Sequence, residues 1–507
     1  MNIKNIKTYI LSGILALSMS SCLDKYPEDS IRMDEAINTV DDMDKLVYGI
    51  YDSFKSSALY SGNLTILPDL QADFVYCVKG YSNAYGDIYR WKDIKATNTD
   101  IESVYGALYG VINNANFLLD NVDKVKANTN SDKELDKLEQ CEGEAYFARA
   151  LAYSELIKCF CKAYDSDEQA AKELGVVLTE HYYGNESQKR ASLKESYEFV
   201  LRDLDKAAEY LKVDEDFTGS LYNEIYFNEY TCHALRARVS LYMHRWDDAI
   251  KYASKVINSK YYVLASCTQK IGNTSYYQYQ WTAGKSTEGI WKVGFTVNSY
   301  GGALGTIFDN FNYVSYRPDY VPETWVINSF DSNDLRAAAI FTTRTTGYEH
   351  GLQWPLLSKY FGDAEFLNNN ILHVHQPMVF RLSEQYLIRA EAYAMNGEYG
   401  KAGKDISTLR TARYSSYGGN TSMSDESSAM KIIEAERVKE LYMEGFRLND
   451  LKRWHKGFER KAADQPAANF VQSSLKVEKD DPLFVWPIPQ HELEAPGSEI
   501  QPNESNK

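Results

Sequence analysis

The sequence predicts a mostly α-helical fold, in which tetratricopeptide-like helical hairpins form a superhelical scaffold and a loop-rich irregular region carries short strands. Three observations support this prediction. Apolar residues recur at helical spacing over long stretches of the chain. Two segments far apart share one spacing of small and aromatic residues, which is typical of a helical repeat. Residues 266–378 lack this periodicity and are rich in Gly, Ser, Asn, Thr and aromatic residues.

The N-terminus has the features of an export signal. Lys4 and Lys7 precede a short apolar run, and small residues then lead to a cysteine. The motif MSSC resembles a bacterial lipobox, which implies that Cys22 is lipidated and becomes the new N-terminus. The alternative is a plain secretory signal that leaves Cys22 as an odd thiol. We therefore expect a lipoprotein signal peptide at 1–21 and a lipid-anchored tether at 22–40.

Three long helices are predicted in the first half of the chain, at 100–122, 142–164 and 193–211. Asp100 and Ser192 stand where an N-cap side chain would accept a hydrogen bond from the first helical turn. Weaker hairpins formed by these helices would join the repeat scaffold.

Two later helical pairs share the repeat spacing. In each, an aromatic follows an alanine by nine residues and a second alanine follows by three: Ala237, Trp246 and Ala249, then Ala390, Tyr399 and Ala402. The small residues let two helices approach closely, and the aromatic opens the second helix after a tight turn. Tyr393 and Gly397 also match the repeat in the second pair, whereas Ser240 and His244 stand there in the first. Unrelated antiparallel hairpins are the alternative interpretation.

The remaining segments complete a single predicted domain at 41–507. The composition of residues 266–378 predicts short strands and long loops, interrupted by one helix at 322–340. The C-terminal segment is punctuated by proline and is predicted to be irregular. The domain would then consist of helical repeats at about 100–265 and 379–456, the loop-rich region at about 266–378, and the irregular segment 461–507.

Composition excludes some classes of function. The 507 residues carry a formal net charge of -16, whereas nucleic acid binding needs clustered Lys and Arg. The same charge argues against docking on anionic lipid through a basic patch. Six cysteines remain besides Cys22, and none forms a CxxC motif. We interpret them as buried free thiols, although an exported protein can also form disulfides.

The sequence offers few catalytic or metal-binding motifs. No nucleophile elbow, HExxH motif, Walker loop or dinucleotide fingerprint stands in a usable context, and no cofactor is expected. His373 and His375 are the best metal-ligand candidates, but two ligands are too few, so we expect no metal site. Glu440, Glu444 and Asp450 could form a hydrolytic carboxylate site.

Those carboxylates belong to the most highly charged stretch, 435–454, for which a structural lattice of ion pairs is the competing interpretation. Apolar residues are interleaved with the charges, so neighbouring helices would cover some of them, and covered charges must be paired. Gly445 would allow a close helix contact. The expected local pairs are Arg437 with Glu440, Glu444 with Arg447, and Asp450 with Arg453.

Loop aromatics are the stronger chemical clue. The chain has 40 Tyr and 8 Trp, and many stand in loops that are rich in Ser, Gly and Asn. Such loops offer rigid flat faces with adaptable hydrogen bonding, which suit sugar rings and also extended peptides. Local packing is the alternative for any single residue. The candidate ligand-binding residues are Tyr81, Tyr85, Trp91, Tyr279, Trp281 and Tyr316.

Several segments together resemble the SusD/RagB family of outer-membrane lipoproteins of Bacteroidetes. They are the lipobox cysteine followed by LDKYP, then VYGALYGVINNANFLLDNV, EAYFARALAYSEL, LSEQYLIRAEAYAMNG, ERVKELYMEGFRLNDLKRW and WPIPQHEL near the end. Their order and spacing make the resemblance specific over nearly the whole chain.

The resemblance implies a non-catalytic protein that is anchored in the outer membrane through Cys22 and faces the cell surface. It would capture oligosaccharides for a SusC-like TonB-dependent transporter, with loops near 76–91 and 270–320 forming the ligand site. Capture of oligopeptides on the same scaffold, as in the RagB branch, is the alternative. A hydrolase that uses the carboxylates of 435–454 is a third hypothesis.

Overall fold

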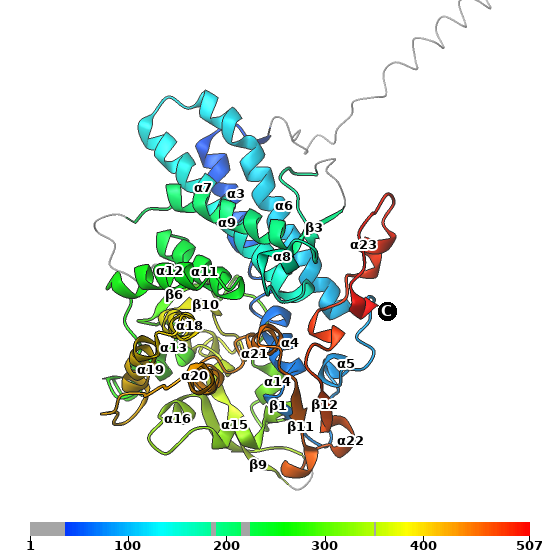
Figure 1. Ribbon diagram of the computed structural model, residues 1–507, viewed down its shortest axis with the longest axis vertical. Coiled ribbons are helices and arrows are strands. Elements are labelled where there is room, and N and C mark those ends of the chain that lie inside the picture. Colours follow the sequence, from blue (N-terminus) through cyan, green and yellow to red (C-terminus); the bar gives the residue numbers. More distant parts are fainter. Residues whose placement is uncertain (1–35, 184–188, 214–223, 349–350, 507) are drawn as a thin grey trace, which may run out of the picture.

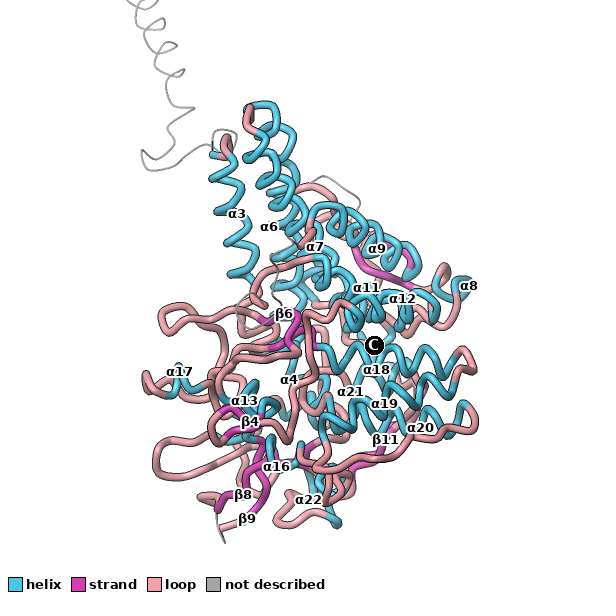
Figure 2. The backbone as a smooth tube through the Cα atoms, turned by 90° about the vertical axis from the view of Figure 1, so that its left-hand side faces the viewer, coloured by secondary structure: helices cyan, strands magenta, loops and turns pink. Residues whose placement is uncertain are grey.

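The computed structural model describes residues 36–183, 189–213, 224–348 and 351–506. Helices fill one side of the molecule, and loops with short strands fill the other (Figure 2). The predicted fold class is therefore confirmed. The predicted signal peptide, with Cys22, lies outside the described residues.

Four long helices form the upper part of Figure 1: α3 (Val40–Ser53), α6 (Thr99–Asn128), α7 (Asp132–Phe160) and α9 (Leu193–Tyr210). Ser192 caps α9 as predicted, in a reciprocal capping box with Glu195. The α6 cap is Asn98 and not Asp100, because the helix begins one residue earlier and the Asn98 side chain accepts from two backbone N–H groups. Helix α7 begins ten residues before the predicted start.

The two predicted repeat pairs are present as α11 (Glu229–Tyr242) with α12 (Trp246–Asn258), and α18 (Leu382–Met395) with α19 (Tyr399–Arg413). The spacing that the two pairs share places Trp246 and Tyr399 at the first position of the second helix in each pair. His244 and Gly397 occupy the same place in the two turns and both have positive φ, 55° and 74°. Glycine adopts this conformation without a steric penalty, whereas His244 does so while stacking on Trp246.

The short strands pair in twos, mostly on the loop side. Antiparallel pairs join β1 (Val75–Cys77) to β7 (Tyr320–Pro322), β6 (Gly289–Lys292) to β10 (Met378–Arg381), β8 (Phe341–Thr345) to β9 (Gln353–Leu357), β4 (Lys270–Ile271) to β5 (Thr274–Ser275), β2 (Leu174–Val177) to β3 (Arg190–Ser192), and β11 (Phe458–Arg460) to β12 (Leu475–Val477). Of these, the β1–β7 pair joins segments that are far apart in the sequence, and it therefore shapes the candidate site.

The remaining helices lie between these elements, and most of them are short. They are α4 (Asn63–Gln71), α5 (Gly86–Tyr89), α8 (Asp167–Ala170), α13 (Tyr276–Thr282), α14 (Thr306–Asp309), α15 (Thr324–Asn328), α16 (Arg336–Ile340), η1 (Ser358–Tyr360), α17 (Ala364–Leu367), α20 (Glu426–Glu440), α21 (Arg447–Arg453), η2 (Ala462–Asp464), α22 (Phe470–Ser473), η3 (Pro482–Phe484), α23 (Gln490–Glu494) and η4 (Glu504–Asn506). The single helix predicted at 322–340 is wrong, because backbone bonds from Leu335 to Arg413 and from Ser415 to Asn333 pin the middle of that segment to the end of α19.

The charged stretch 435–454 is not one helix. Helix α20 ends at Glu440, and α21 begins at Arg447. Between them Gly445 adopts a φ of 83°, and its N–H donates to Asp69 at 2.9 Å. A Cβ at Gly445 would lie 3.1 Å from the carbonyl oxygen of Leu64, so the glycine permits the close contact with α4 that was predicted.

Glu440 is the centre of a buried lattice of ion pairs. It is fully buried and accepts from Arg336 at 2.9 Å, Arg413 at 2.8 Å and Arg381 at 2.5 Å. Burial alone would raise the pKa of Glu440, but these guanidinium groups more than offset it and hold the pKa well below its ordinary value. Glu444 extends the lattice, since it accepts from Arg381 and Lys359.

The expected pairing of this stretch is only partly right. Asp450 does pair with Arg453, at 2.9 Å, but Arg437 also binds Asp450 and not Glu440. Arg447 binds Asp73 at 2.8 Å, a residue more than 370 positions away, and not Glu444. The predictions failed because they used neighbours within one helix, whereas the break at Gly445 turns these side chains toward other segments.

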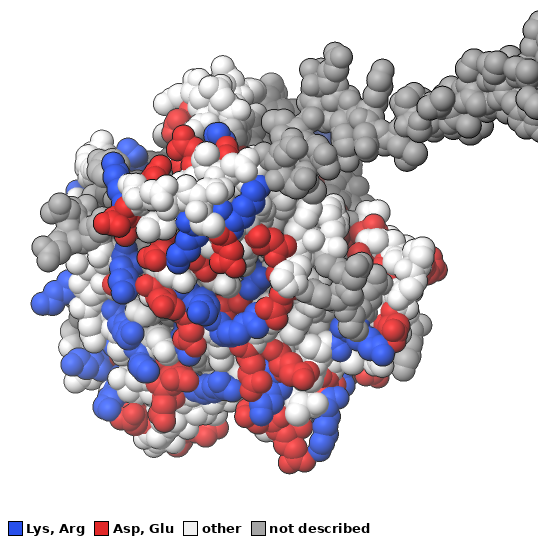
Figure 3. All heavy atoms as spheres, turned by 90° about the horizontal axis from the view of Figure 1, so that it is seen from above, with Lys and Arg blue, Asp and Glu red and all other residues white. Residues whose placement is uncertain are grey.

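The six described cysteines are buried and unpaired, in agreement with the interpretation as free thiols. Among the described residues, no helix combines the length and apolar character needed to cross a bilayer. Seen from above, Lys and Arg alternate with Asp and Glu over the helices (Figure 3), so on this face the acidic net charge does not gather into one patch.

Replacing Arg447 with alanine should lower the free energy of unfolding by about 3 kcal/mol, because it leaves the nearly buried carboxylate of Asp73 without its bidentate partner. Chemical denaturation would measure the change. Arg202→Ala is the matched control: Arg202 pairs with Glu180 at a half-exposed position, and its loss should cost less than about 1 kcal/mol. Equal losses in the two variants would contradict the proposed role of the lattice.

Candidate functional site

One surface on the loop side gathers tyrosines and arginines, and we call it the loop face. The β1–β7 pair brings the segment after β1 next to the segment before β7, and the β8–β9 hairpin packs beside them. A hydrogen bond joins the two segments, since the Ser82 N–H donates to Asp319 at 2.6 Å. The loop face consists of Tyr81, Tyr313, Tyr316, Arg317, Arg344 and Tyr348.

Tyr316 lies at the centre of the loop face. Its ring stacks on Phe311, with 4.5 Å between centroids and 24° between planes. The guanidinium carbon of Arg344 lies 5.2 Å from the ring centroid of Tyr316, a cation–π distance. The backbone carbonyl of Tyr316 accepts a hydrogen bond from the Gly347 N–H at 2.7 Å. Tyr316 is thus held in a fixed orientation while part of it stays exposed.

Tyr81 forms a second fixed ring. Its hydroxyl donates to Asn83 and accepts from Arg90, both at 2.9 Å, and Arg90 also pairs with Asp87. Partial burial raises the pKa of Tyr81 to about 12, so the hydroxyl stays protonated and keeps its hydrogen bond to Asn83. The exposed Asn83 and Asp87 beside it supply an amide and a carboxylate, the groups that bind sugar hydroxyls.

Tyr348 closes the loop face beside Tyr81. Its ring lies next to Gly80, and its hydroxyl donates to the carbonyl of Pro318 at 2.7 Å. The guanidinium carbon of Arg317 lies 5.9 Å from its centroid. Sequence analysis missed Tyr348 and both arginines because they follow no motif, and only the strand pairings bring them to the predicted tyrosines.

A buried acid lies under the loop face. Asp309, at the end of α14, is 2 % exposed, and its Oδ2 has no hydrogen-bond partner among the described residues. Burial raises the pKa of Asp309 to about 8, and the charge of Arg344 opposes this only weakly. The carboxyl group is therefore largely protonated at neutral pH.

The other predicted site residues are not all on this face. Trp281 is 1 % exposed and packs against Tyr277 and His375. Trp91 is held by packing on Phe458 and Phe484 and by a bond from its indole N–H to a backbone carbonyl.

Tyr85 and Tyr279 also lie away from the exposed rings of the loop face. Tyr85 is half-buried between the two largest apolar clusters of the molecule. Tyr279 is half-buried in α13. Of the six predicted residues, Tyr81 and Tyr316 are therefore the two that the fold brings together on one open surface.

A second aromatic surface lies on α3, and we call it the α3 groove. It is a hollow of about 430 Å³ lined by Tyr48, Tyr51, Tyr226 and Trp291, among others. Tyr48 and Tyr226 are 56 % and 47 % exposed. Sequence analysis missed this surface because Tyr48 stands in an amphipathic helix, where an aromatic residue is usually part of the core.

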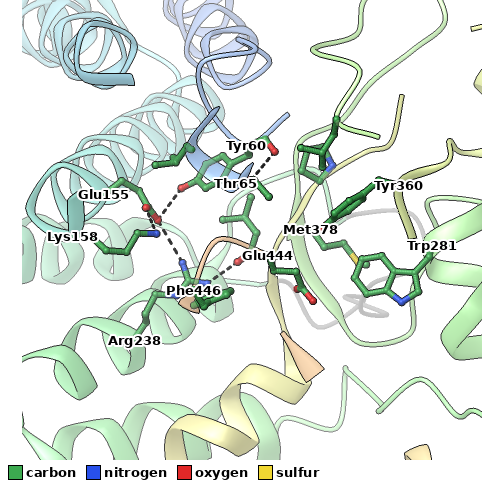
Figure 4. Close-up of a pocket in the computed structure, with 14 residues that line it drawn as sticks. Tyr60, Thr65, Glu155, Lys158, Arg238, Trp281, Tyr360, Met378, Glu444 and Phe446 are labelled. Atoms are coloured by element: carbon green, nitrogen blue, oxygen red, sulfur yellow. Dashed lines mark hydrogen bonds and ion pairs between the residues drawn. The ribbon is translucent and has the colours of Figure 1, made fainter. Parts of the chain in front are cut away.

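The interior cavity shown in Figure 4 is unsuited to a nutrient. Glu155 binds Tyr60 and Arg238 on one side, while Trp281 and Met378 line the other (Figure 4). Its volume of about 30 Å³ suits one or two waters, far below the roughly 300 Å³ of small-molecule sites.

Comparison with known proteins identifies the family. A sequence model of the SusD family matches residues 342–503, and a model described as starch-binding, associating with the outer membrane, matches residues 22–241. The chain belongs to the SusD family. No protein in the curated set is similar enough to count as a match.

Solved structures share the fold of this SusD-family protein. A SusD superfamily protein from Bacteroides thetaiotaomicron has a TM-score of 0.76 at 23% identity, covering 92% of this chain and 99% of its own. A putative sugar binding protein from Bacteroides vulgatus has a TM-score of 0.75 at 22% identity, with coverages of 93% and 100%. Surface glycan-binding protein A from Bacteroides fluxus has a TM-score of 0.66 at 19% identity, with coverages of 92% and 100%.

The histidine pair of this SusD-family protein is structural. His375 Nδ1 lies 2.6 Å from Asp363, and His373 Nε2 accepts from the backbone of Phe311. The two stand in a loop. No cluster of three potential metal ligands occurs among the described residues.

Replacing Asp309 with asparagine should stabilise the protein increasingly as pH rises. The unfolded carboxyl ionises near pH 4 and the folded one near pH 8, so between these values the unfolded state binds fewer protons and wild-type stability falls by about 1.4 kcal/mol per pH unit. Asparagine does not titrate, so the melting temperatures of the two proteins should diverge from pH 5 to pH 8. Parallel curves would show that Asp309 is not protonated when folded.

Proposed function

We propose that this protein is a non-catalytic, cell-surface lipoprotein that captures oligosaccharides on the loop face and delivers them to a SusC-like TonB-dependent transporter in the outer membrane. The observation that carries the proposal is the fixed, partly exposed pair Tyr81 and Tyr316, flanked by arginines, an amide and a carboxylate. Flat rings bind the C–H faces of sugars, and the polar groups bind their hydroxyls. The family description as starch-binding supports the same ligand class.

The carboxylates of the charged stretch support a non-catalytic role. Glu440, Glu444 and Asp450 are buried, and each binds at least two cationic side chains. Burial raises their pKa values, but the paired cations more than offset this and leave them below ordinary values. An acid catalyst instead needs a raised pKa and access to substrate.

Anchoring through Cys22 is the second part of the proposal. The match to the starch-binding family model begins at residue 22, which is where a mature lipoprotein would begin. The sequence around it supports lipid attachment, and the family description supports association with the outer membrane.

Alanine at Tyr316 or Tyr81 should weaken binding of the best oligosaccharide in a broad panel at least about tenfold, because each removes a stacking platform. Isothermal titration calorimetry measures the affinity, and circular dichroism checks the fold. Tyr48→Ala in the α3 groove is the matched control, being another exposed tyrosine, and should bind as wild type. If only the control loses affinity, capture occurs in the α3 groove; if the protein binds tryptic peptides and no glycan, the ligand class is wrong.

Serine at Cys22 should abolish lipid attachment and move the protein from the membrane fraction to the soluble fraction of the cell envelope. Mass spectrometry of the mature N-terminus and cell fractionation would detect the change. Cys267→Ser replaces a buried thiol and should leave the distribution unchanged. Unaltered membrane association of the Cys22 variant would refute the anchor.

A further inference from the structure

A polar cavity of about 330 Å³ lies away from the loop face, where three segments distant in sequence meet. They are the connection from α7 to α8, the end of α21, and the C-terminal segment from 480 to 504 that is orange to red in Figure 1. Its volume falls at the lower end of the range for small-molecule sites. None of its lining residues belongs to the loop face or to the α3 groove.

Lys452 lines this cavity without an anionic partner. Its ammonium group donates to the carbonyls of Lys158 and Cys161, at 2.5 and 3.0 Å, and so caps the C-terminal end of α7. It forms no ion pair with the described carboxylates, and burial lowers its pKa to about 8. An ammonium has three N–H donors, so these two carbonyls leave one donor unused.

The polar groups opposite Lys452 are acceptors. Asp481 accepts the backbone N–H of Leu483 through Oδ1 at 2.9 Å, which leaves its other oxygen for a ligand, and the exposed Glu504 stands beside it. An apolar wall follows, formed by Pro482, Phe484 and Val485. Donor, acceptors and apolar wall are the groups that a sugar ring requires.

A histidine that binds two carboxylates fixes the rim of the cavity. His455 lies between two carboxylates, with Nδ1 2.6 Å from Asp480 and Nε2 2.9 Å from Asp165. Burial lowers the pKa of His455, but the two carboxylates more than offset this and raise it. The bridge joins the α7–α8 connection to the C-terminal segment, so the cavity has a defined opening.

The charge of the lining selects among ligands. Five carboxylates face the cavity, against two lysines and His455: Asp165, Glu173, Asp480, Asp481 and Glu504. This excess of negative charge disfavours uronic acids and sugar phosphates. Three of the five carboxylates already have partners within the protein, Asp165 and Asp480 on His455 and Glu173 on Lys162, which leaves Asp481 and Glu504 for a ligand. A neutral molecule that both donates and accepts hydrogen bonds remains.

We propose that this cavity is a second carbohydrate site, which takes one neutral mono- or disaccharide between Lys452, Asp481, Glu504 and the Phe484 wall. This proposal goes beyond capture on the loop face, and an experiment that refutes one of the two sites does not refute the other. Because it is enclosed on several sides, it would hold a short sugar or the end of a longer chain, whereas the open loop face would hold an extended one.

The experiment uses the full chain and three neutral probes, maltose, cellobiose and lactose, in calorimetry and in crystal soaks. Ala163→Trp fills the cavity with an indole, and should weaken the best probe at least about tenfold and remove its density there. Ala338→Trp, at an exposed position of α16, is the matched control and should bind as wild type. Tyr316→Ala should leave the density of the probe in the cavity unchanged, which separates this site from the loop face.

A second variant tests the proposal in case Ala163→Trp does not fold. Asp481→Asn keeps an acceptor for Leu483 but replaces the oxygen left for the ligand with an NH2 donor, and should weaken binding of the probe about fivefold. The proposal is overturned if no probe binds the wild-type protein, if density lies elsewhere, or if neither variant changes the affinity. Tighter binding of glycine or sodium glucuronate than of the three sugars would show that the chemical class is wrong.

Discussion

The fold depends on the ion pairs that surround Glu440. Three arginines from separate parts of the chain, Arg336, Arg381 and Arg413, meet this one fully buried carboxylate. Glu288 accepts from two of the same arginines and ties in the segment before β6. Since an unpaired buried charge costs several kcal/mol, each partner fixes the others. The lattice therefore joins the helical repeats to the loop side as one rigid unit.

This rigidity matters for the loops that the lattice supports. The loop face has few regular hydrogen bonds of its own, because its strands are short and paired in twos. Its tyrosines are instead fixed by side-chain contacts: Tyr316 by Phe311, Tyr81 by Arg90, and Tyr348 by Pro318. Rings that are already oriented lose little conformational entropy when a ligand stacks on them, which favours binding by a surface that is not deeply enclosed.

The open loop face and the polar cavity would bind sugars of different length in the proposed capture. An extended surface suits long chains, and an enclosed pocket of about 330 Å³ suits a short unit. Both are built where segments distant in sequence meet, one at the β1–β7 pair and one at the His455 bridge. The helical scaffold thus contributes to binding mainly by holding irregular segments in place.

The sequence by itself determined the helical repeats, since the spacing of Ala390, Tyr399 and Ala402 encodes a hairpin through contacts that are local. It also determined that the charges of 435–454 must be paired, because apolar residues between them require burial. Only the tertiary structure decided the partners. Arg447 binds Asp73 across more than 370 residues, and no local spacing specifies such a pair.

The same limit applied to the candidate site. Tyr316 and Trp281 stand in segments that are similarly rich in aromatic residues, yet Tyr316 stays partly exposed, whereas Trp281, in α13, is only 1 % exposed. Composition reports which residues can stack on a ligand, but whether a ring reaches solvent depends on what covers it. That cover comes from segments far along the chain, so exposure of the site was fixed by the fold and not by the loops that carry it.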